Sequence, residues 1–188
     1  LRYGMQAAEQ VTGALKTRLE RRLGSMDALR TLFAERLENL YLPAPDPETG
    51  LIEQFDGYYQ KKFLDLRPYK ETGRVAEILR DYSFDDLNLY QAAKQADVVQ
   101  LLYLAGRQYS DEIRRKNYLY YEARTLHDSS LSRAIHSILA SDLGMGEEAY
   151  RMFRGAAETD LGDISDSCDN GIHAANMGGI WQAVVMGF

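Results

Sequence analysis

The chain has 188 residues, a formal net charge of −6 and one cysteine, so it can form one domain with a sizeable core but no internal disulfide. Because the balance is acidic and no long basic block occurs, we expect neither nucleic acids nor membranes as partners. No apolar run approaches the roughly 20 residues of a membrane-spanning helix, the start does not resemble a signal peptide, and the lone Cys168 fits a reducing cytoplasm.

Apolar residues recur with helical spacing in the first part of the chain. The spacing predicts a first helix over residues 6–23. It predicts a second helix over residues 25–40, with Ser25 as its N-cap. Prolines within residues 43–47 then end the helical pattern in an extended loop. Residues 50–57, bounded by two glycines, are predicted to form a buried loop or a short strand.

Helical spacing resumes at residue 90 and continues through the rest of the chain. Ser110 and Asp128 are candidate N-caps. Because strand signals are scarce and helices follow one another through long loops, the pattern predicts an all-α fold, either a bundle or a toroid of helical hairpins. Loops of this length usually carry function. The predicted helices cover residues 90–104, 111–118, 130–143, 146–159 and 174–186.

Lys94 and Gln95 form the first candidate site, at the predicted start of a helix whose next turns are apolar. A lysine that faces a core is unfavourable unless it is paired. Lysine and amide side chains both present rotatable donors, so the pair can bind sugar hydroxyls. The alternative, which the residues alone favour, is the ordinary start of an amphipathic helix.

A second candidate site lies within residues 118–136, where aromatic residues lead into His127-Asp128-Ser129-Ser130. Small hydroxyls at a helix N-terminus meet free backbone N–H groups, which suits an anion. Ser129 is not expected to be a hydrolase nucleophile, because no Gly-x-Ser-x-Gly motif surrounds it. The alternative is a helix cap beside an aromatic core cluster, and His136 is predicted to be a core histidine.

A third candidate site begins at His173 and includes Gly178 and Gly179. Glycines let backbone amides approach an anion and the imidazole adds a donor or a charge, so this segment can hold phosphate. It is not a P-loop, because no Gly-Lys-Ser/Thr is present. The alternative is a glycine-rich helix contact that permits close packing. The three histidines have no familiar metal-ligand spacing, so no metal is predicted.

Several segments, in one order, resemble glycoside hydrolase family 65, the maltose, trehalose and kojibiose phosphorylases. The resemblance covers nearly the whole chain and implies an (α/α)6 barrel of inner and outer helices. Residues 1–188 would then be one domain, the C-terminal part of this catalytic barrel. The family's N-terminal β-sandwich, the first part of the barrel and the C-terminal β-domain would be absent. The matching segments are residues 52–58, 94–98, 120–122 with Thr125, 127–132, 134–137 and 169–181.

The resemblance also implies roles for the candidate residues. Lys94 and Gln95 match the pair that holds the glucosyl unit next to the scissile bond. The family's general acid glutamate would lie in the absent part of the barrel, so we expect no catalytic residue in this chain and no turnover by the chain alone. The residues that match the region receiving inorganic phosphate are His173, Gly178, Gly179, Ser129 and Ser130.

The implied reaction is inverting phosphorolysis of an α-glucosyl disaccharide to β-glucose 1-phosphate. Phosphate itself is the nucleophile, so the carboxylate base of an inverting hydrolase is unnecessary. The expected ligands are the disaccharide and inorganic phosphate, without another cofactor. The enzyme is expected in the cytoplasm, and a homo-oligomer is possible. One alternative is a trehalose or related disaccharide hydrolase, with Asp128 or Asp169 as its base. A non-catalytic sugar-binding or structural helical module is the other alternative.

Overall fold

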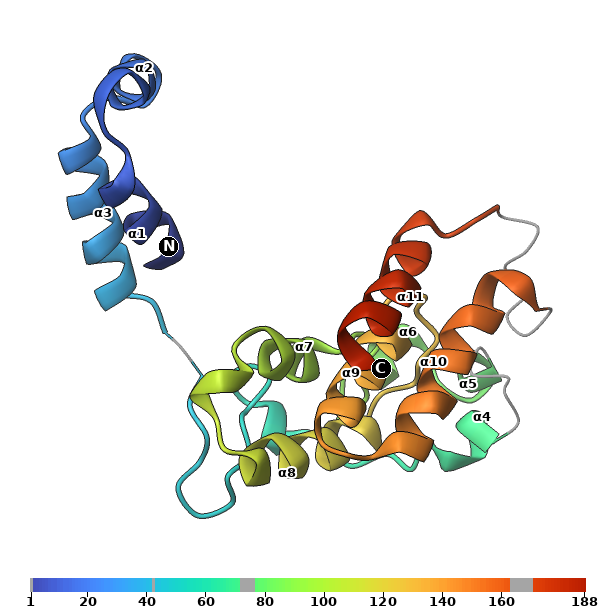
Figure 1. Ribbon diagram of the computed structural model, residues 1–188. Helices are drawn as coiled ribbons and strands as arrows, with labels where there is room; N and C mark the ends of the chain where they lie inside the picture. The colour runs from blue at the N-terminus through green and yellow to red at the C-terminus, as the bar shows by residue number, and fades with distance from the viewer. Residues whose placement is uncertain (1, 42, 72–76, 163–170) are drawn as a thin grey trace. The chain divides into compact units, whose positions relative to one another are not determined.

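The computed structural model describes residues 2–41, 43–71, 77–162 and 171–188, which fold into helices joined by irregular segments (Figure 1). Contacts divide the chain into two compact units, Leu1–Leu42 and Pro43–Phe188. Within the described ranges no strand forms, and β-type pairing is limited to isolated bridges. None of the described helices is long and apolar enough to cross a membrane.

The described residues of the first unit, 2–41, form three helices where two were predicted. They are α1 (Arg2–Gln10), α2 (Gly13–Leu23) and α3 (Met26–Glu38). The single helix predicted over residues 6–23 is wrong, because Thr12 is extended and Gly13 has a left-handed φ of 58°. The predicted cap of α3 is confirmed, since the Ser25 hydroxyl accepts a hydrogen bond from the Ala28 amide at 3.4 Å.

The second unit begins with the segment predicted to be a buried loop or short strand. It is a loop with one antiparallel bridge between Pro45 and Ile52. Ile52 is fully buried, and its amide donates to the Asn117 side-chain oxygen at 2.8 Å. The Asn117 amide group donates in turn to the Gly50 carbonyl at 2.8 Å. The Tyr121 hydroxyl also donates to the Ile52 carbonyl, so two side chains of α8, from Asn117 and Tyr121, hold the loop to the core.

Residues 58–90 contain short helices that the sequence did not predict. They are η1 (Tyr58–Gln60), α4 (Arg67–Glu71), α5 (Ile78–Asp81) and α6 (Phe84–Leu87). Helices of four or five residues are too short to show a helical period. A small cluster of buried residues holds this region together, namely Leu64, Leu66, Ile78 and Leu126.

The remaining α-helices confirm the predicted ones with shifted ends, and the short η3 was not predicted. They are α7 (Asp97–Leu104), η3 (Gly106–Gln108), α8 (Asp111–Glu122), α9 (Ser132–Asp142), α10 (Gly146–Leu161) and α11 (Ala174–Gly187). Helix α9 is central to the core and contacts α7, α8, α10 and α11. Its Ile138 and Leu139 are fully buried. Ser110 caps α8 as predicted, because its hydroxyl accepts from the Ile113 amide at 3.3 Å.

Helices α9 and α10 form an antiparallel hairpin. Arg133, near the start of α9, donates to the Gly155 carbonyl at 3.1 Å. Ser137, one turn later, donates to the earlier Ala149 carbonyl of α10 at 2.8 Å. The two helices therefore run in opposite directions.

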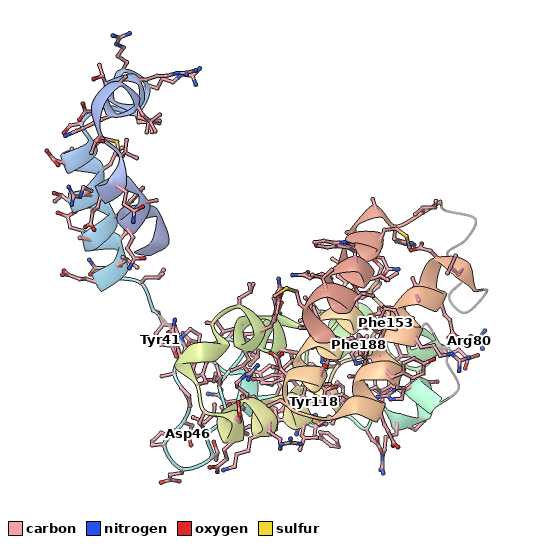
Figure 2. The ribbon with its side chains drawn as sticks, in the orientation of Figure 1. Tyr41, Asp46, Arg80, Tyr118, Phe153 and Phe188 are labelled. Atoms are coloured by element: carbon pink, nitrogen blue, oxygen red, sulfur yellow. The ribbon has the colours of Figure 1, made fainter. Side chains whose placement is uncertain are left out.

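Helix α11 packs on the same hairpin and runs parallel to α9 (Figure 1). A Cβ atom added to Gly179 would lie 3.0 Å from the Cβ atom of Ala134. Eight residues later, a Cβ atom on Gly187 would lie 3.4 Å from the Ile138 Cα atom. Beyond α11, the Phe188 ring packs edge to face on Phe153 of α10, with centroids 5.4 Å apart (Figure 2). The N-terminal ends of α9 and α11 therefore lie at the same end of the three-helix layer.

Candidate functional site

Lys94 and Gln95 lie in a loop, and not inside a helix as predicted, because α7 begins only at Asp97. The loop is fixed by a parallel bridge between Ala93 and Thr125. Within it, the Leu126 amide donates to the Ala93 carbonyl at 3.0 Å. This bridge places the first candidate segment directly beside the second.

Both residues of the first candidate site contact the second. The Lys94 ammonium nitrogen lies 4.0 Å from a carboxylate oxygen of Asp128. The Ser129 hydroxyl donates to the side-chain oxygen of Gln95 at 3.2 Å. Lys94 remains 65% exposed, so its ammonium group is accessible and does not face the core. The structure therefore joins the predicted sugar-binding pair to the predicted anion-binding segment.

The start of α9 differs from the predicted capping by Asp128. Leu131 is the N-cap residue, and its amide donates to the Ser129 hydroxyl at 3.2 Å. Asp128 instead faces Lys94, and burial raises the pKa of its carboxyl group while Lys94 acts in the opposite direction. Ser130 is partly buried next to this turn. Asp128 is therefore part of the candidate site and not a helix cap.

His127 organises this turn, although no separate role was predicted for it. Its φ of 59° makes it a left-handed non-glycine residue, a conformation in which histidine is enriched. Its ring is buried and its Nδ1 lies 2.9 Å from the Ser132 hydroxyl. The left-handed residue turns the chain so that the His127 ring is buried while the Asp128 side chain stays partly accessible, at 31%. His136 is a fully buried core histidine, as predicted, with its Nδ1 2.9 Å from the Ser132 carbonyl.

His173 is the N-cap residue of α11, where an acidic partner holds it in place. Its Nδ1 and its backbone nitrogen lie 2.7 and 3.0 Å from one carboxylate oxygen of Asp160, at the end of α10. Asn176 donates to the other oxygen at 2.8 Å. These hydrogen bonds lower the pKa of Asp160 to about 2, and the bond from Asn176 has the largest effect on the pKa. The ring orientation of His173 is therefore fixed by an ionised carboxylate.

Gly178 and Gly179 lie in the second turn of α11, and not in a turn that precedes a helix. Amides beyond the first turn bond within the helix, so these two are not free to donate to an anion. Gly179 packs against Ala134, as the helix-contact alternative proposed, whereas a Cβ atom on Gly178 would meet nothing within 4 Å. The assignment of both glycines to the phosphate region stays a prediction. Gly178 would contribute to it by leaving space and not by donating its amide.

The parallel arrangement of α9 and α11 relates the two predicted parts of the phosphate site. Ser129 and Ser130 precede the N-terminal end of α9, and His173 caps the N-terminal end of α11. Since both ends lie on the same side of the helical layer, these residues face one end of the fold. Asp169, the other carboxylate considered as a hydrolase base, lies outside the described residues, as does Cys168.

Comparison with known proteins decides the family. The model of the glycosyl hydrolase family 65 central catalytic domain matches residues 1–182. The chain belongs to glycosyl hydrolase family 65. The resemblance inferred from the ordered segments is thereby confirmed.

Individual members of family 65 match over most of this chain. A kojibiose phosphorylase from Halothermothrix orenii is 47% identical over 156 residues, which cover 83% of this chain and 20% of that protein. A maltose phosphorylase from Bacillus subtilis is 30% identical over 189 residues, which cover 100% of this chain and 24% of that protein. The chain therefore spans between a fifth and a quarter of the length of these relatives.

A solved structure of a family 65 protein supports the fold. It is described as a putative kojibiose phosphorylase from the human microbiome, and it superposes with a TM-score of 0.72 at 32% identity. The superposition covers 85% of this chain and 23% of the other. The predicted fold, an all-α portion of a helical barrel, is confirmed.

Two residues of this family 65 chain were missed by sequence reasoning. Asp160 lies 13 positions before His173, and no local pattern connects the two. His127 was noticed only as part of a polar run. The available signal was its residue type, because histidine tolerates a left-handed backbone conformation and here stands shortly before a predicted helix.

Proposed function

We propose that the protein containing this chain is an inverting phosphorylase of an α-glucosyl disaccharide, which uses inorganic phosphate and releases β-glucose 1-phosphate. Residues 1–188 would form one domain, the C-terminal part of its (α/α)6 catalytic barrel. The disaccharide and inorganic phosphate would be its ligands, without another cofactor. Membership of family 65 and the phosphorylase relatives support this proposal.

One observation supports assigning this function to particular residues. Lys94 contacts Asp128, and Gln95 contacts Ser129. Phosphorolysis requires phosphate beside the anomeric carbon of the bound glucosyl unit, in line with the scissile bond. A sugar-binding pair in direct contact with an anion-binding turn satisfies this requirement. The proposed phosphate ligands are Ser129, Ser130 and His173. Gly178 leaves space beside them, and the neighbouring Gly179, also assigned to this region, packs against Ala134.

The contacts also indicate how the sugar-binding pair works. The Gln95 side-chain oxygen accepts from Ser129, so its amide NH2 group is left to donate to sugar hydroxyls. The Lys94 ammonium group is exposed and only 4.0 Å from Asp128, so it can contact both a hydroxyl and this carboxylate. The general acid that protonates the leaving oxygen would come from outside this chain, so the chain alone is expected to be inactive.

The hydrolase alternative rests on Asp128. Burial raises the pKa of its carboxyl group, against the opposing effect of Lys94, and a base with a raised pKa is better matched to water activation. Against this role, Lys94 lies on the same carboxylate. Phosphorolysis requires no such base and accounts for the anion-binding turn beside it.

The test is product analysis in the complete protein. We would incubate it with kojibiose, maltose and trehalose, with and without inorganic phosphate, and measure β-glucose 1-phosphate and free glucose. The proposal expects phosphate-dependent β-glucose 1-phosphate, which is lost in His173→Ala. Glucose release that is indifferent to phosphate would identify a hydrolase, and the absence of any product would favour a non-catalytic module.

A further inference from the structure

A cavity of about 430 Å³ lies between α10, the start of α9 and the residues around α4. Its volume falls in the range of small-molecule sites. None of the residues that line it belongs to the proposed sugar or phosphate positions described above. The cavity is therefore a separate feature of the fold, and its lining determines which ligand it fits.

Helix α10 contributes a charged stripe to the cavity. Glu147, Arg151, Arg154 and Glu158 all line it, and their spacing of four, three and four residues places them on one helix face. The arginines occupy the middle of the stripe and the glutamates its two ends. Arg154 pairs with Glu158 at 2.6 Å and remains 68% exposed, at the mouth of the cavity.

Arg133 of α9 enters the cavity across a glycine of α10. A Cβ atom on Gly155 would lie 3.1 Å from the Arg133 side chain, so the absent side chain lets the arginine cross the helix. One guanidinium nitrogen donates to the Gly155 carbonyl at 3.1 Å. Within the described part of the chain Arg133 forms no ion pair, although it is partly buried. Most of its five donors therefore remain available to a ligand.

His127 supplies an unpartnered nitrogen to the same cavity. Its ring is 5% exposed, and its buried Nε2 makes no hydrogen bond with the described residues. The carboxylate of Glu122 lies 3.9 Å from this nitrogen but is bonded to the Lys70 ammonium at 2.8 Å. Lys70, Arg133 and Arg151 line the same cavity as His127, whose buried ring nitrogen has unused hydrogen-bonding capacity. Lys70 is paired with Glu122 and Arg151 with Glu148 at 2.6 Å.

We propose that this cavity binds a phosphorylated sugar at a site separate from the proposed active site. A phosphate monoester carries up to two negative charges and three acceptor oxygens, which match the donors of Arg133, the exposed guanidinium of Arg154 and the unpartnered His127 nitrogen. Lys70 and Arg151, which are paired with Glu122 and Glu148, add positive charge to the lining. Hydroxyl groups of the sugar match the acceptors of Glu147 and Glu158 at the ends of the stripe. The exposed Tyr150 ring in the lining offers a face for packing against the sugar.

The experiment measures equilibrium binding by calorimetry in the complete protein, in a His173→Ala background that disables the proposed active-site phosphate position. The probes are glucose 6-phosphate, inorganic phosphate and glucose. The test variants are Arg133→Gln and Arg154→Glu. Arg115→Gln is the control for the first, since Arg115 also donates to a backbone carbonyl of another segment. Arg80→Glu is the control for the second, since Arg80 is an exposed arginine paired with a glutamate.

We expect glucose 6-phosphate to bind and glucose not to bind. Each test variant should weaken glucose 6-phosphate binding about tenfold or more, while each control changes it by less than about twofold. Because Arg154 is exposed, its variant tests the site even if Arg133→Gln fails to fold. No binding of glucose 6-phosphate, or binding unchanged in Arg154→Glu, would overturn the site. Equal affinity for inorganic phosphate would overturn the sugar-phosphate assignment.

This outcome does not depend on the proposed function. Binding at the cavity is measured without turnover, so a parent protein that proves to be a hydrolase leaves the test intact. Conversely, phosphate-dependent turnover in the unmodified protein would stand even if glucose 6-phosphate failed to bind the cavity.

Discussion

At the scale of single residues, Lys94 is the side chain whose function the structure makes most testable. Its ammonium group is exposed beside Asp128 and next to Gln95, where a glucosyl unit would bind. Since hydrogen bonds to charged groups contribute more than neutral ones, Lys94→Ala should lower kcat/KM of the complete protein about tenfold to a hundredfold. Steady-state kinetics with kojibiose or maltose would measure this change.

Lys62→Ala is the matched control for Lys94→Ala. Lys62 is also an exposed loop lysine. Its own backbone forms a parallel bridge with Tyr90, whereas Lys94 follows the bridged Ala93. It lies outside the candidate site, so its replacement should leave kcat/KM within about twofold of the unmodified protein. Equal losses in the two variants would contradict a sugar-binding role for Lys94.

Asp160 acts as a positioning residue for His173. Its carboxylate contacts both the backbone and the ring of His173 and is 5% exposed. In Asp160→Asn the charge that fixes the imidazole is lost, so KM for phosphate should rise about tenfold, with a smaller change in kcat. Asp142→Asn, which removes a carboxylate bonded to Arg114 at 2.7 Å, should leave KM for phosphate unchanged. A fall in kcat alone would argue against the positioning role.

The same carboxylate makes stability depend on pH in the acid range. Hydrogen bonds from Asn176 and His173 lower the pKa of Asp160 from 3.8 to about 2 in the folded state. A lowered folded-state pKa stabilises the fold fully above the unfolded value, and this stabilisation is lost as the pH falls towards 2. The difference in unfolding free energy between the unmodified chain and Asp160→Asn should therefore shrink from pH about 5 to about 2. Denaturant titrations at several pH values would measure it, and a constant difference would exclude the linkage.

Parts of the site that lie within one short segment could be predicted from the sequence, whereas contacts between residues far apart in the chain could not. The Asp128–Ser129 turn was identified from its small hydroxyls before a predicted helix. For Lys94 and Gln95 the residues alone favoured an ordinary helix start, and the resemblance to family 65 implied their sugar-binding role. That this pair touches the turn depends on the bridge between Ala93 and Thr125, a pairing that no local signal encodes. The Asp160 carboxylate was missed for the same reason, since it reaches His173 only because α10 and α11 run antiparallel.

At the scale of elements, the helices α8 to α11 were predicted to within a few residues, whereas the single helix predicted over residues 6–23 is two helices. Helix α9 was expected over residues 130–143 and spans Ser132–Asp142, because its buried face repeats over three turns. Helix α7 was expected from residue 90 but begins at Asp97, since the residues before it pair with the loop after α8. The spacing of apolar residues indicates which residues are buried, but it does not indicate which tertiary contacts bury them.

Two adjacent glycines allow a sharp test of how α11 packs on α9. A Cβ atom on Gly179 would lie 3.0 Å from Ala134, whereas one on Gly178 would meet nothing within 4 Å. Overpacking should make Gly179→Ala less stable by about 1–3 kcal/mol. Gly178→Ala should instead stabilise by up to about 1 kcal/mol, because alanine favours the helix. Urea unfolding would measure the free energy of unfolding of both variants. Equal changes in the two variants would contradict the contact between Gly179 and Ala134.

At the scale of the whole molecule, α11 presents apolar side chains that nothing in the described chain covers. Trp181 is 67% exposed, Val185 is 53% exposed and Met186 is 54% exposed. Contiguous exposed apolar surface on a soluble chain marks a contact face or an aggregation risk. The chain also spans only 20% of its kojibiose phosphorylase relative, so a covering partner from the rest of the protein is consistent with this face.

The isolated 188-residue chain should therefore self-associate through α11. Sedimentation velocity over a range of concentrations should show species larger than the monomer, and Val185→Glu should shift the population towards monomer, because a buried unpaired charge is unfavourable at an apolar contact. Leu119→Glu, on α8, replaces a leucine that is 55% exposed and should leave the distribution unchanged. If both variants dissociate the chain equally, added charge and not this helix face controls association. If the unmodified chain is monomeric at every concentration, the exposed face of α11 does not drive assembly.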